Sequence, residues 1–218
     1  MLPKIGKNQS LSQQAYSAIK KAILSNELKP KELLREEALA STLGISRTPL
    51  RAALKQLQFE KLIVVNSSKH AFVSEVKPEI MTKVFVYRFA VEPIAARAAA
   101  STIEREDIGR IEDCLARHEE HIREGKLDKI IACELEFSRL IAESTRNEFL
   151  IDGTEMVNTY MQRFIAMSKT VTADVTESVG EHRGILEALD KGDGTLAEER
   201  TVRHLYNVAG RARFKLPF

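Results

Sequence analysis

Residues 39–54 read LASTLGISRTPLRAAL, and this stretch decides the fold of the N-terminal part of the chain. The pattern predicts a short helix over about 35–43 that stops at Gly44, because glycine tolerates the positive φ of a helix C-terminal cap. A new helix follows and runs to about Phe59. Pro49 fits its first turn, where the missing N–H is not needed. Two helices joined by a tight turn are therefore expected.

The sequence on either side completes a winged helix-turn-helix. Apolar residues at helical spacing predict a first helix over about 10–25. After the third helix, 62–65 and 71–73 are short β-branched or aromatic runs on either side of a polar turn at 66–70, which predicts a β-hairpin. We therefore assign residues 1–77 to a winged helix-turn-helix domain with a small β-hairpin.

The second domain, residues 78–218, is expected to be all-helical. Glycine and polar residues interrupt its apolar periodicity, and the region is large enough for a core of its own. The chain as a whole is thus mainly α, with a C-terminal antiparallel bundle of about six helices. The predicted helices are 79–100, 104–124, 128–145, 147–168, 173–190 and 194–213.

Charge is distributed unevenly between the two parts. Residues 1–75 hold 12 Lys and Arg against 6 Asp and Glu, whereas the remainder holds 21 against 25, which together give the net charge of +2. The N-terminal domain, called the head below, is thus basic and the rest of the chain acidic, which indicates a polyanionic partner for the head.

Cys114 and Cys133 match neither a disulfide framework nor a metal spacing. The N-terminus has no signal peptide pattern and no run could span a bilayer, so a cytoplasmic protein without a membrane partner is expected.

The third helix carries a basic face suited to the major groove of DNA. Arg47, Arg51 and Lys55 are four residues apart, and the apolar residues lie on the opposite face. Either arginine could read a guanine through a bidentate contact. An ordinary helix with a solvated basic face is the alternative. The turn, the hairpin and the charge of the head favour DNA binding.

Other residues of the head are candidates for backbone contacts. Ser46 or Thr48 caps the third helix, and either hydroxyl suits phosphate oxygens. Lys69 and His70, at the tip of the hairpin, are placed to reach an adjacent groove or the DNA backbone.

Residues 28–73 resemble the winged helix of the GntR family of bacterial regulators, and the match rests on the 39–54 run quoted above. The resemblance implies that Arg35, Arg47, Thr48 and Arg51, together with the wing tip, contact the operator. In three places the sequence departs from the family, because a larger residue stands where glycine is common. These residues are Asn26, Lys31 and His70.

Beyond Pro78 the chain resembles the FadR-like branch of this family, whose effector domain (FCD type) is a helical bundle. The residues that carry this resemblance are Tyr87, Arg88, Val91, Glu92, Pro93, Ala95, Ala96, Arg97, Glu136, Phe137, Ser144, Asn147, Glu181, His182, His204 and Leu205. The resemblance implies a divalent metal held by one carboxylate and three histidines, with a small organic acid completing the site. Glu134 stands where aspartate is usual and Ser138 where the third histidine belongs.

Spacing independently places two histidines together. His182 and His204 lie eleven residues before and after Asp193, so they are level and can face each other across an antiparallel helix pair. Three outcomes remain open: a weak Zn or Ni site of His182, His204 and Glu134; a metal-free pocket; or two structural histidines. In the metal-free pocket Arg88 would bind an effector carboxylate, although it could equally pair with Glu92.

Ser138 completes the expected set of effector-binding residues. His118 and His121, which lie among charged residues, are interpreted as a solvated face.

The expected function is that of a homodimeric transcriptional regulator, and a repressor is preferred over an activator. The protein is expected to bind a pseudo-palindromic operator under the control of a small carboxylate effector. An enzyme is not expected. Two rivals are kept: a metal-assisted hydrolase using Glu134, His182 and His204, and an architectural DNA binder without sequence preference.

Overall fold

The computed structural model describes residues 10–168, 175–212 and 214–217. It divides into two compact units, Met1–Val76 and Lys77–Phe218, each of which is considered by itself. The predicted start of a helix at residue 173 falls outside the described residues. None of the described helices has the length and apolar content that a membrane crossing requires.

The first unit is a winged helix-turn-helix with one strand more than the sequence predicts. Its elements are α1 (Leu11–Leu24), β1 (Leu33–Leu34), α2 (Glu36–Leu43), α3 (Arg47–Phe59), β2 (Ile63–Val65) and β3 (Ala71–Val73). The antiparallel sheet has the order β1-β3-β2, with Leu33 paired to Phe72. A two-residue strand has too little alternation to be recognised from sequence.

The core of this unit lies between α1, α3 and the sheet. Leu50 and Leu57 on α3 are fully buried, and they share one cluster with Ile19 on α1 and Ile63 on β2. Gly44 ends α2 with a φ of 64°, which confirms the predicted left-handed cap. This core holds α3 with its apolar side inward and its opposite side in solvent.

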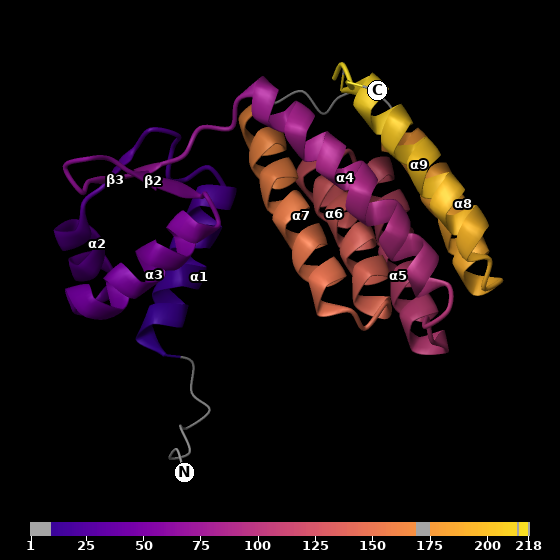
Figure 1. Cartoon of the computed structure of the whole chain (residues 1–218), viewed down its shortest axis with the longest axis horizontal. Coiled ribbons are helices and arrows are strands. Elements are labelled where there is room, and N and C mark those ends of the chain that lie inside the picture. The colour runs from indigo at the N-terminus through magenta and orange to yellow at the C-terminus, as the bar shows by residue number, and fades with distance from the viewer. Residues whose placement is uncertain (1–9, 169–174, 213, 218) are drawn as a thin grey trace, which may run out of the picture. The chain divides into compact units, whose positions relative to one another are not determined.

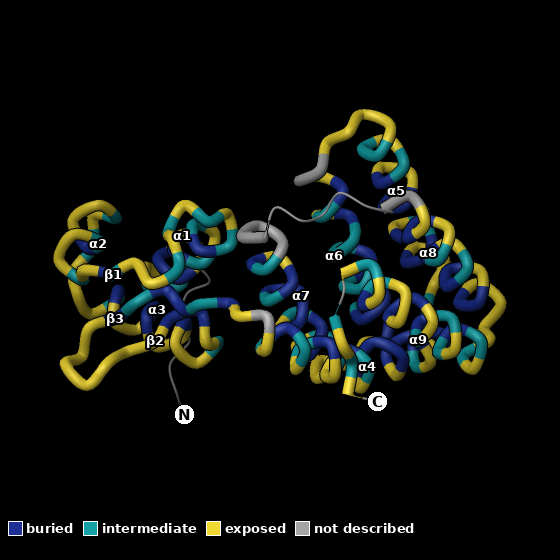
Figure 2. The backbone as a smooth tube through the Cα atoms, turned by 90° about the horizontal axis from the view of Figure 1, so that it is seen from above, coloured by how far each residue is buried: buried dark blue, intermediate teal, exposed yellow. Residues whose placement is uncertain are grey.

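The second unit is a helical bundle. Its helices run closely aligned, as Figure 1 shows, and α4 packs against α6, α7 and α9 while α5 packs against α6 and α8. Most of these helices are buried along one side and exposed along the other, whereas the helix over residues 127–144 is mostly buried or half-buried (Figure 2). The helices are α4 (Pro78–Ala99), α5 (Arg105–Glu124), α6 (Leu127–Ser144), α7 (Glu148–Ser168), α8 (Val175–Asp190) and α9 (Gly194–Arg211).

Local sequence explains where these helices begin and end. Glu104 and Asp107 form a reciprocal capping box at the start of α5, and Gly125 ends it in the left-handed region. Asp193 accepts a hydrogen bond from the backbone N–H of Leu196 at the start of α9. The α8–α9 turn therefore folds the chain back on itself and aligns the two helices that carry His182 and His204.

Candidate functional site

The exposed face of α3 is basic. Arg47, Arg51 and Lys55 are exposed, whereas Leu50 and Leu54 on the other side of the same helix are buried. The structure thus places the three basic side chains on the solvent side of the helix, as their four-residue spacing predicts.

The predicted phosphate-contacting residues surround the start of α3. Ser46 is the N-cap residue, but its side chain makes no capping hydrogen bond. Thr48 in the first turn is exposed, and so is Arg35, which is the N-cap residue of α2. An exposed hydroxyl next to the N–H groups of a helix N-terminus suits a phosphate oxygen.

Two carboxylates of α2 pair with the arginines of α3. Glu36 Oε2 lies 2.8 Å from Arg51 Nε, and Glu37 Oε1 lies 3.0 Å from Arg47 Nη2. All four side chains keep contact with solvent. Sequence reasoning missed these pairs, because the partners are ten and fifteen residues apart along the chain.

The left-handed residue of the hairpin tip stands one position before the residue that replaces a family glycine. Lys69, and not His70, adopts the left-handed region with a φ of 61°. The backbone N–H of His70 donates a hydrogen bond to Asn66 Oδ1, and the Lys69 N–H donates one to the Asn66 carbonyl. Asn26 and Lys31, which also replace family glycines, are left-handed, with φ of 59° and 68°.

Inside the second unit, three helices bring a carboxylate and two imidazoles together. His118 comes from α5, Glu134 from α6 and His182 from α8, and one ligand atom from each lies within 4.8 Å of the others. His118 Nε2 is 3.4 Å from Glu134 Oε1, and His182 Nε2 is 3.7 Å from Glu134 Oε2. We call these three residues the buried cluster.

Polar atoms of the buried cluster lack hydrogen-bond partners. Among the described residues, both ring nitrogens of His118, Nδ1 of His182 and Oε1 of Glu134 are buried and unbonded. Burial lowers the pKa of His118 to about 4 and the pKa of His182 well below its usual value, while it raises the pKa of Glu134. Both imidazoles are therefore neutral at neutral pH, the form that binds a metal ion.

His204 on α9 borders the buried cluster. Its ring centroid lies 4.6 Å from that of His182, and its Nδ1 lies 2.6 Å from Glu181 Oε2. Burial raises the pKa of Glu181, but hydrogen bonds from His204, Arg211 and Asn207 lower it to about 2. Glu181 is therefore ionised and holds the His204 ring in one orientation.

The other predicted effector residues have partners within the protein. The Ser138 hydroxyl lies 3.2 Å from both the Leu135 carbonyl and Asn158 Oδ1, and its one proton can be donated to either acceptor. Arg88 pairs with Glu92 through Nε–Oε1 at 2.6 Å and Nη2–Oε2 at 3.2 Å, the second of the two alternatives that the sequence left open.

His118 is the residue that sequence reasoning misplaced. It is fully buried, so its interpretation as part of a solvated face is wrong. The misleading signal was its charged neighbours. Helical spacing from Ile111 and Cys114 carries the buried stripe of α5 onward to His118, and this periodicity could have revealed it.

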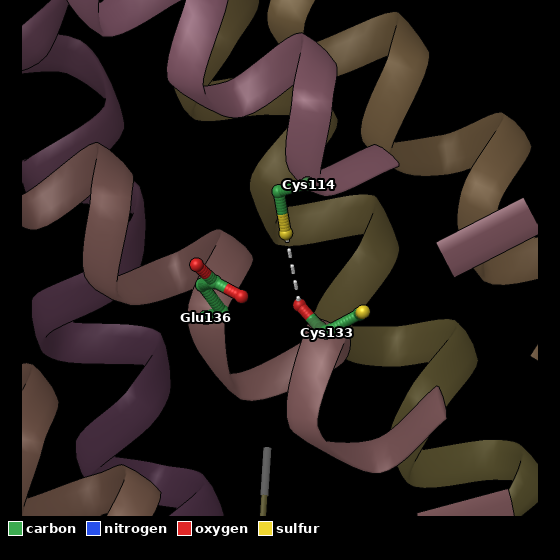
Figure 3. Close-up of side chains that lie close together, drawn as sticks. All are labelled: Cys114, Cys133 and Glu136. Carbon is green, nitrogen blue, oxygen red and sulfur yellow. Dashed lines mark hydrogen bonds between the residues drawn. The ribbon is translucent and has the colours of Figure 1, made fainter. Parts of the chain in front are cut away.

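A second group of metal-ligating side chains consists of Cys114, Cys133 and Glu136. Figure 3 shows the Cys114 thiol directed at the Cys133 carbonyl oxygen, 3.5 Å away. Burial raises the pKa of Cys114 to about 12, so this thiol stays protonated. Glu136 accepts two hydrogen bonds from Arg117, and the group is therefore satisfied without an ion.

The buried cluster, in contrast, fits a divalent metal ion. Its donors are nitrogen and oxygen atoms, which zinc and nickel accept, and several of them have no other partner. The Glu134 carboxylate could act as a ligand of a bound ion, whose positive charge would offset that of the carboxylate.

Two family models match the chain. Residues 11–73 match the bacterial regulatory proteins of the gntR family, and residues 83–207 match the FCD domain. Together the two matches extend over both units of the structure.

Individual proteins are similar along most of the chain. The HTH-type transcriptional regulator YdhC of Bacillus subtilis (strain 168) is 24% identical over 88% of this chain and 86% of its own. The HTH-type transcriptional repressor RspR of Escherichia coli (strain K12) is 24% identical over 94% and 90%. The solved structure of E. coli McbR/YncC covers 94% of this chain and 99% of its own, with a TM-score of 0.80 at 22% identity, which shows a shared fold.

Proposed function

Because this chain belongs to the GntR family of bacterial regulators that carry an FCD domain, we propose that it is a repressor whose affinity for its operator is controlled by a small carboxylate effector. It is a transcriptional regulator and not an enzyme, so the hydrolase rival is set aside. Repression is supported by relatives that are named repressors, RspR among them. Within this proposal residues 1–77 bind DNA, and residues 78–218 bind the effector and form the dimer.

The observation that carries the proposal is the exposed basic face of α3. Arg47 and Arg51 stand in solvent near the N-terminal end of this helix, which reaches base edges in helix-turn-helix proteins. Lys55 extends the face towards the phosphates, and Lys69 and His70 at the wing tip are exposed as well. Two copies of this surface in a homodimer would read a pseudo-palindrome.

DNA binding is tested by fluorescence anisotropy with the upstream region of the protein's own gene and a random duplex of equal length. At about 150 mM salt, where non-specific binding is weak, we expect a preference of at least about 1,000-fold for the operator. Equal affinity for both duplexes would instead identify an architectural DNA binder.

Effector binding is proposed for the polar interior of the second unit. His182 and His204 lie side by side next to Glu134, and the charges of Arg88 and Arg211 act on that carboxylate. Because Glu92 already neutralises Arg88, the histidines are the proposed primary contacts, with Ser138 and Arg88 around them. A thermal-shift screen of small carboxylic acids and sugar acids tests this, and a hit should weaken operator binding.

Dimerisation is supported by an exposed apolar row on α4. Val86, Tyr87 and Ile94 are exposed on one side of this helix. Sedimentation equilibrium should give twice the chain mass, and Ile94→Asp should lower the dimer fraction; a monomeric wild-type protein would refute the proposal. We also propose that the regulator acts in the cytoplasm, where its operator is accessible.

A further inference from the structure

The two carboxylates at the start of α2 are exposed to different extents. Glu36 and Glu37 occupy the first turn of this helix. The Glu36 side chain is 33% exposed and contacts Arg51. The Glu37 side chain is 86% exposed and contacts Arg47 through Oε1, so within the part of the chain that the structure describes its Oε2 has no protein partner. One carboxylate is thus half-buried, whereas the other projects into solvent beside the first residue of α3.

Glu37 lies on the surface that faces DNA in the proposed function. Arg47 begins α3, and this end of the helix reaches base edges in helix-turn-helix proteins. Arg47 Nη2 lies 3.0 Å from Glu37 Oε1, which keeps the carboxylate next to that end. A carboxylate there repels phosphates, so it weakens binding to DNA of any sequence unless it makes a favourable contact of its own.

We propose that Glu37 reads a cytosine in the major groove, where its carboxylate accepts a hydrogen bond from the N4 amino group of the base. The proposal rests on the proposed function, because it requires α3 to enter the groove. Glutamate is a suitable acceptor for the cytosine amino group. Thymine presents O4 in the groove and guanine presents N7 and O6, all of which are acceptors that a carboxylate repels. Adenine offers an amino group but has the acceptor N7 beside it. Glu37 therefore favours cytosine over the three other bases.

The ion pair makes this contact compatible with base reading by arginine. A guanidinium has five N–H donors, and Glu37 engages Arg47 at Nη2. Arg47 can therefore still donate to N7 and O6 of a guanine. The two opposite charges also offset each other, which lowers the cost of placing a carboxylate among phosphates. Arg47 and Glu37 together are suited to a guanine and a neighbouring cytosine.

Glu36 provides a matched control for Glu37. Both carboxylates stand in the first turn of α2, where a negative charge stabilises the helix N-terminus, and both pair with an arginine of α3. Glu36→Ala and Glu37→Ala therefore each remove one charge and one ion pair. A purely structural role of Glu37 would change stability or overall affinity without changing which base is preferred at one position. Base preference thus separates a reading role from a structural one.

The inference is tested with the full-length wild type and these two variants. Duplexes selected from a randomised library define the preferred site, and fluorescence anisotropy then measures the affinity with each of the four base pairs at each position. We expect one position in each half-site where the wild type prefers cytosine by at least about fivefold, the lower end of the cost of one mismatch. Glu37→Ala should lose the preference at this position alone, and Glu36→Ala should retain it.

A second measurement changes the DNA instead of the protein. The cytosine at that position is replaced by a pyrimidinone nucleotide, which lacks the N4 amino group. The wild type and Glu36→Ala should lose at least about fivefold in affinity per half-site, whereas Glu37→Ala should bind both duplexes alike. An equal loss in all three proteins, or an unchanged cytosine preference in Glu37→Ala, would overturn the proposal alone. A wild type without preference at any position would overturn sequence-specific DNA binding as well.

Discussion

Glu36 Oε2 lies 2.8 Å from Arg51 Nε, so a carboxylate of α2 is paired with the arginine placed to read a base. The Nη1 and Nη2 groups of Arg51 remain able to contact a guanine, but the Glu36 carboxylate offsets the positive charge that Arg51 presents to DNA. The pair also holds the Arg51 side chain in the free protein, and the Glu36 charge opposes the approach of the DNA phosphates. The same relationship recurs between Glu37 and Arg47.

Glu36→Gln should raise the affinity for DNA. Exposed ion pairs contribute up to about 1 kcal/mol, so a gain of roughly two- to fivefold is expected for operator and random duplex alike. Anisotropy titrations at several salt concentrations measure it. The exposed Glu27 in the same unit gives the control Glu27→Gln, which should change the affinity less. A loss of affinity in Glu36→Gln would mean that the pair positions Arg51 for binding.

Arg51→Ala should remove most of the preference for the operator. A bidentate arginine–guanine contact contributes about 1–3 kcal/mol, which corresponds to a loss of roughly 5- to 150-fold per half-site. Lys21→Ala removes the same charge from the exposed side of α1 and should retain specificity. A gel shift with operator and competitor DNA reports both results, and an unchanged preference in Arg51→Ala would refute the role given to α3.

Lys69→Gly should separate the conformation of the wing tip from its charge. A lysine at a φ of 61° is strained, so glycine should raise the free energy of unfolding by up to about 1 kcal/mol. The lost charge should at the same time weaken DNA binding. His70→Gly should give no such stabilisation, because His70 is not left-handed. Urea denaturation of both variants decides the point, and equal stabilities would contradict it.

Asp107→Asn should destabilise the second unit in a pH-dependent way. Burial raises the pKa of Asp107, but hydrogen bonds from Arg146 and from the Glu104 N–H lower it below its usual value. Loss of this buried charge should lower the free energy of unfolding by about 1–3 kcal/mol at neutral pH.

The sign of the pH effect follows from the lowered pKa. Ionised Asp107 contributes its stability above the unfolded pKa of about 3.9, and the contribution is lost as the pH falls through the lower folded value. The difference in the free energy of unfolding between wild type and Asp107→Asn should therefore become smaller on acidification. The exposed Asp113 on the same helix gives the control Asp113→Asn, which should show no comparable gap at either pH. A gap of constant size would contradict the assignment.

Arg88 and Glu92 should behave as a coupled pair. Both are buried, so Arg88→Met or Glu92→Met alone leaves an uncompensated charge and should cost about 3–5 kcal/mol. The double variant removes both charges and should recover most of that loss. Chemical denaturation of the four proteins gives the coupling free energy. Additive losses would show that the two side chains act independently.

Most of the fold could be predicted from the sequence because its signals are local. Gly44 ends α2 by its own conformational freedom, and the helical periodicity of α3 places Leu50 and Leu57 inward. The wing strands are short β-branched or aromatic runs, and a polar turn lies between them. The strand β1 was missed because its two residues are defined by their pairing with Phe72 and Ala71, far along the chain.

The candidate site could be predicted only in part, because it depends on which helices meet. Spacing about Asp193 was enough to bring His182 towards His204, since one turn joins their helices. His118 lies on α5, whose contact with α8 no local pattern reveals. Glu92 lies one helical turn from Arg88, so the sequence could offer it as one possible partner, with an effector carboxylate as the other. Only the packing of the bundle decides between them.

The packing around Cys114 and Cys133 has a practical consequence for labelling. Both thiols are buried and held in the protonated form, so maleimides and other reagents that need an exposed thiolate should react with them slowly in the native protein. A cysteine introduced at an open position, such as Phe59, which is 88% exposed, would then be modified selectively. Fluorophores could be attached there without first removing the native cysteines, and motion of the DNA-binding head could be followed in the otherwise unaltered regulator.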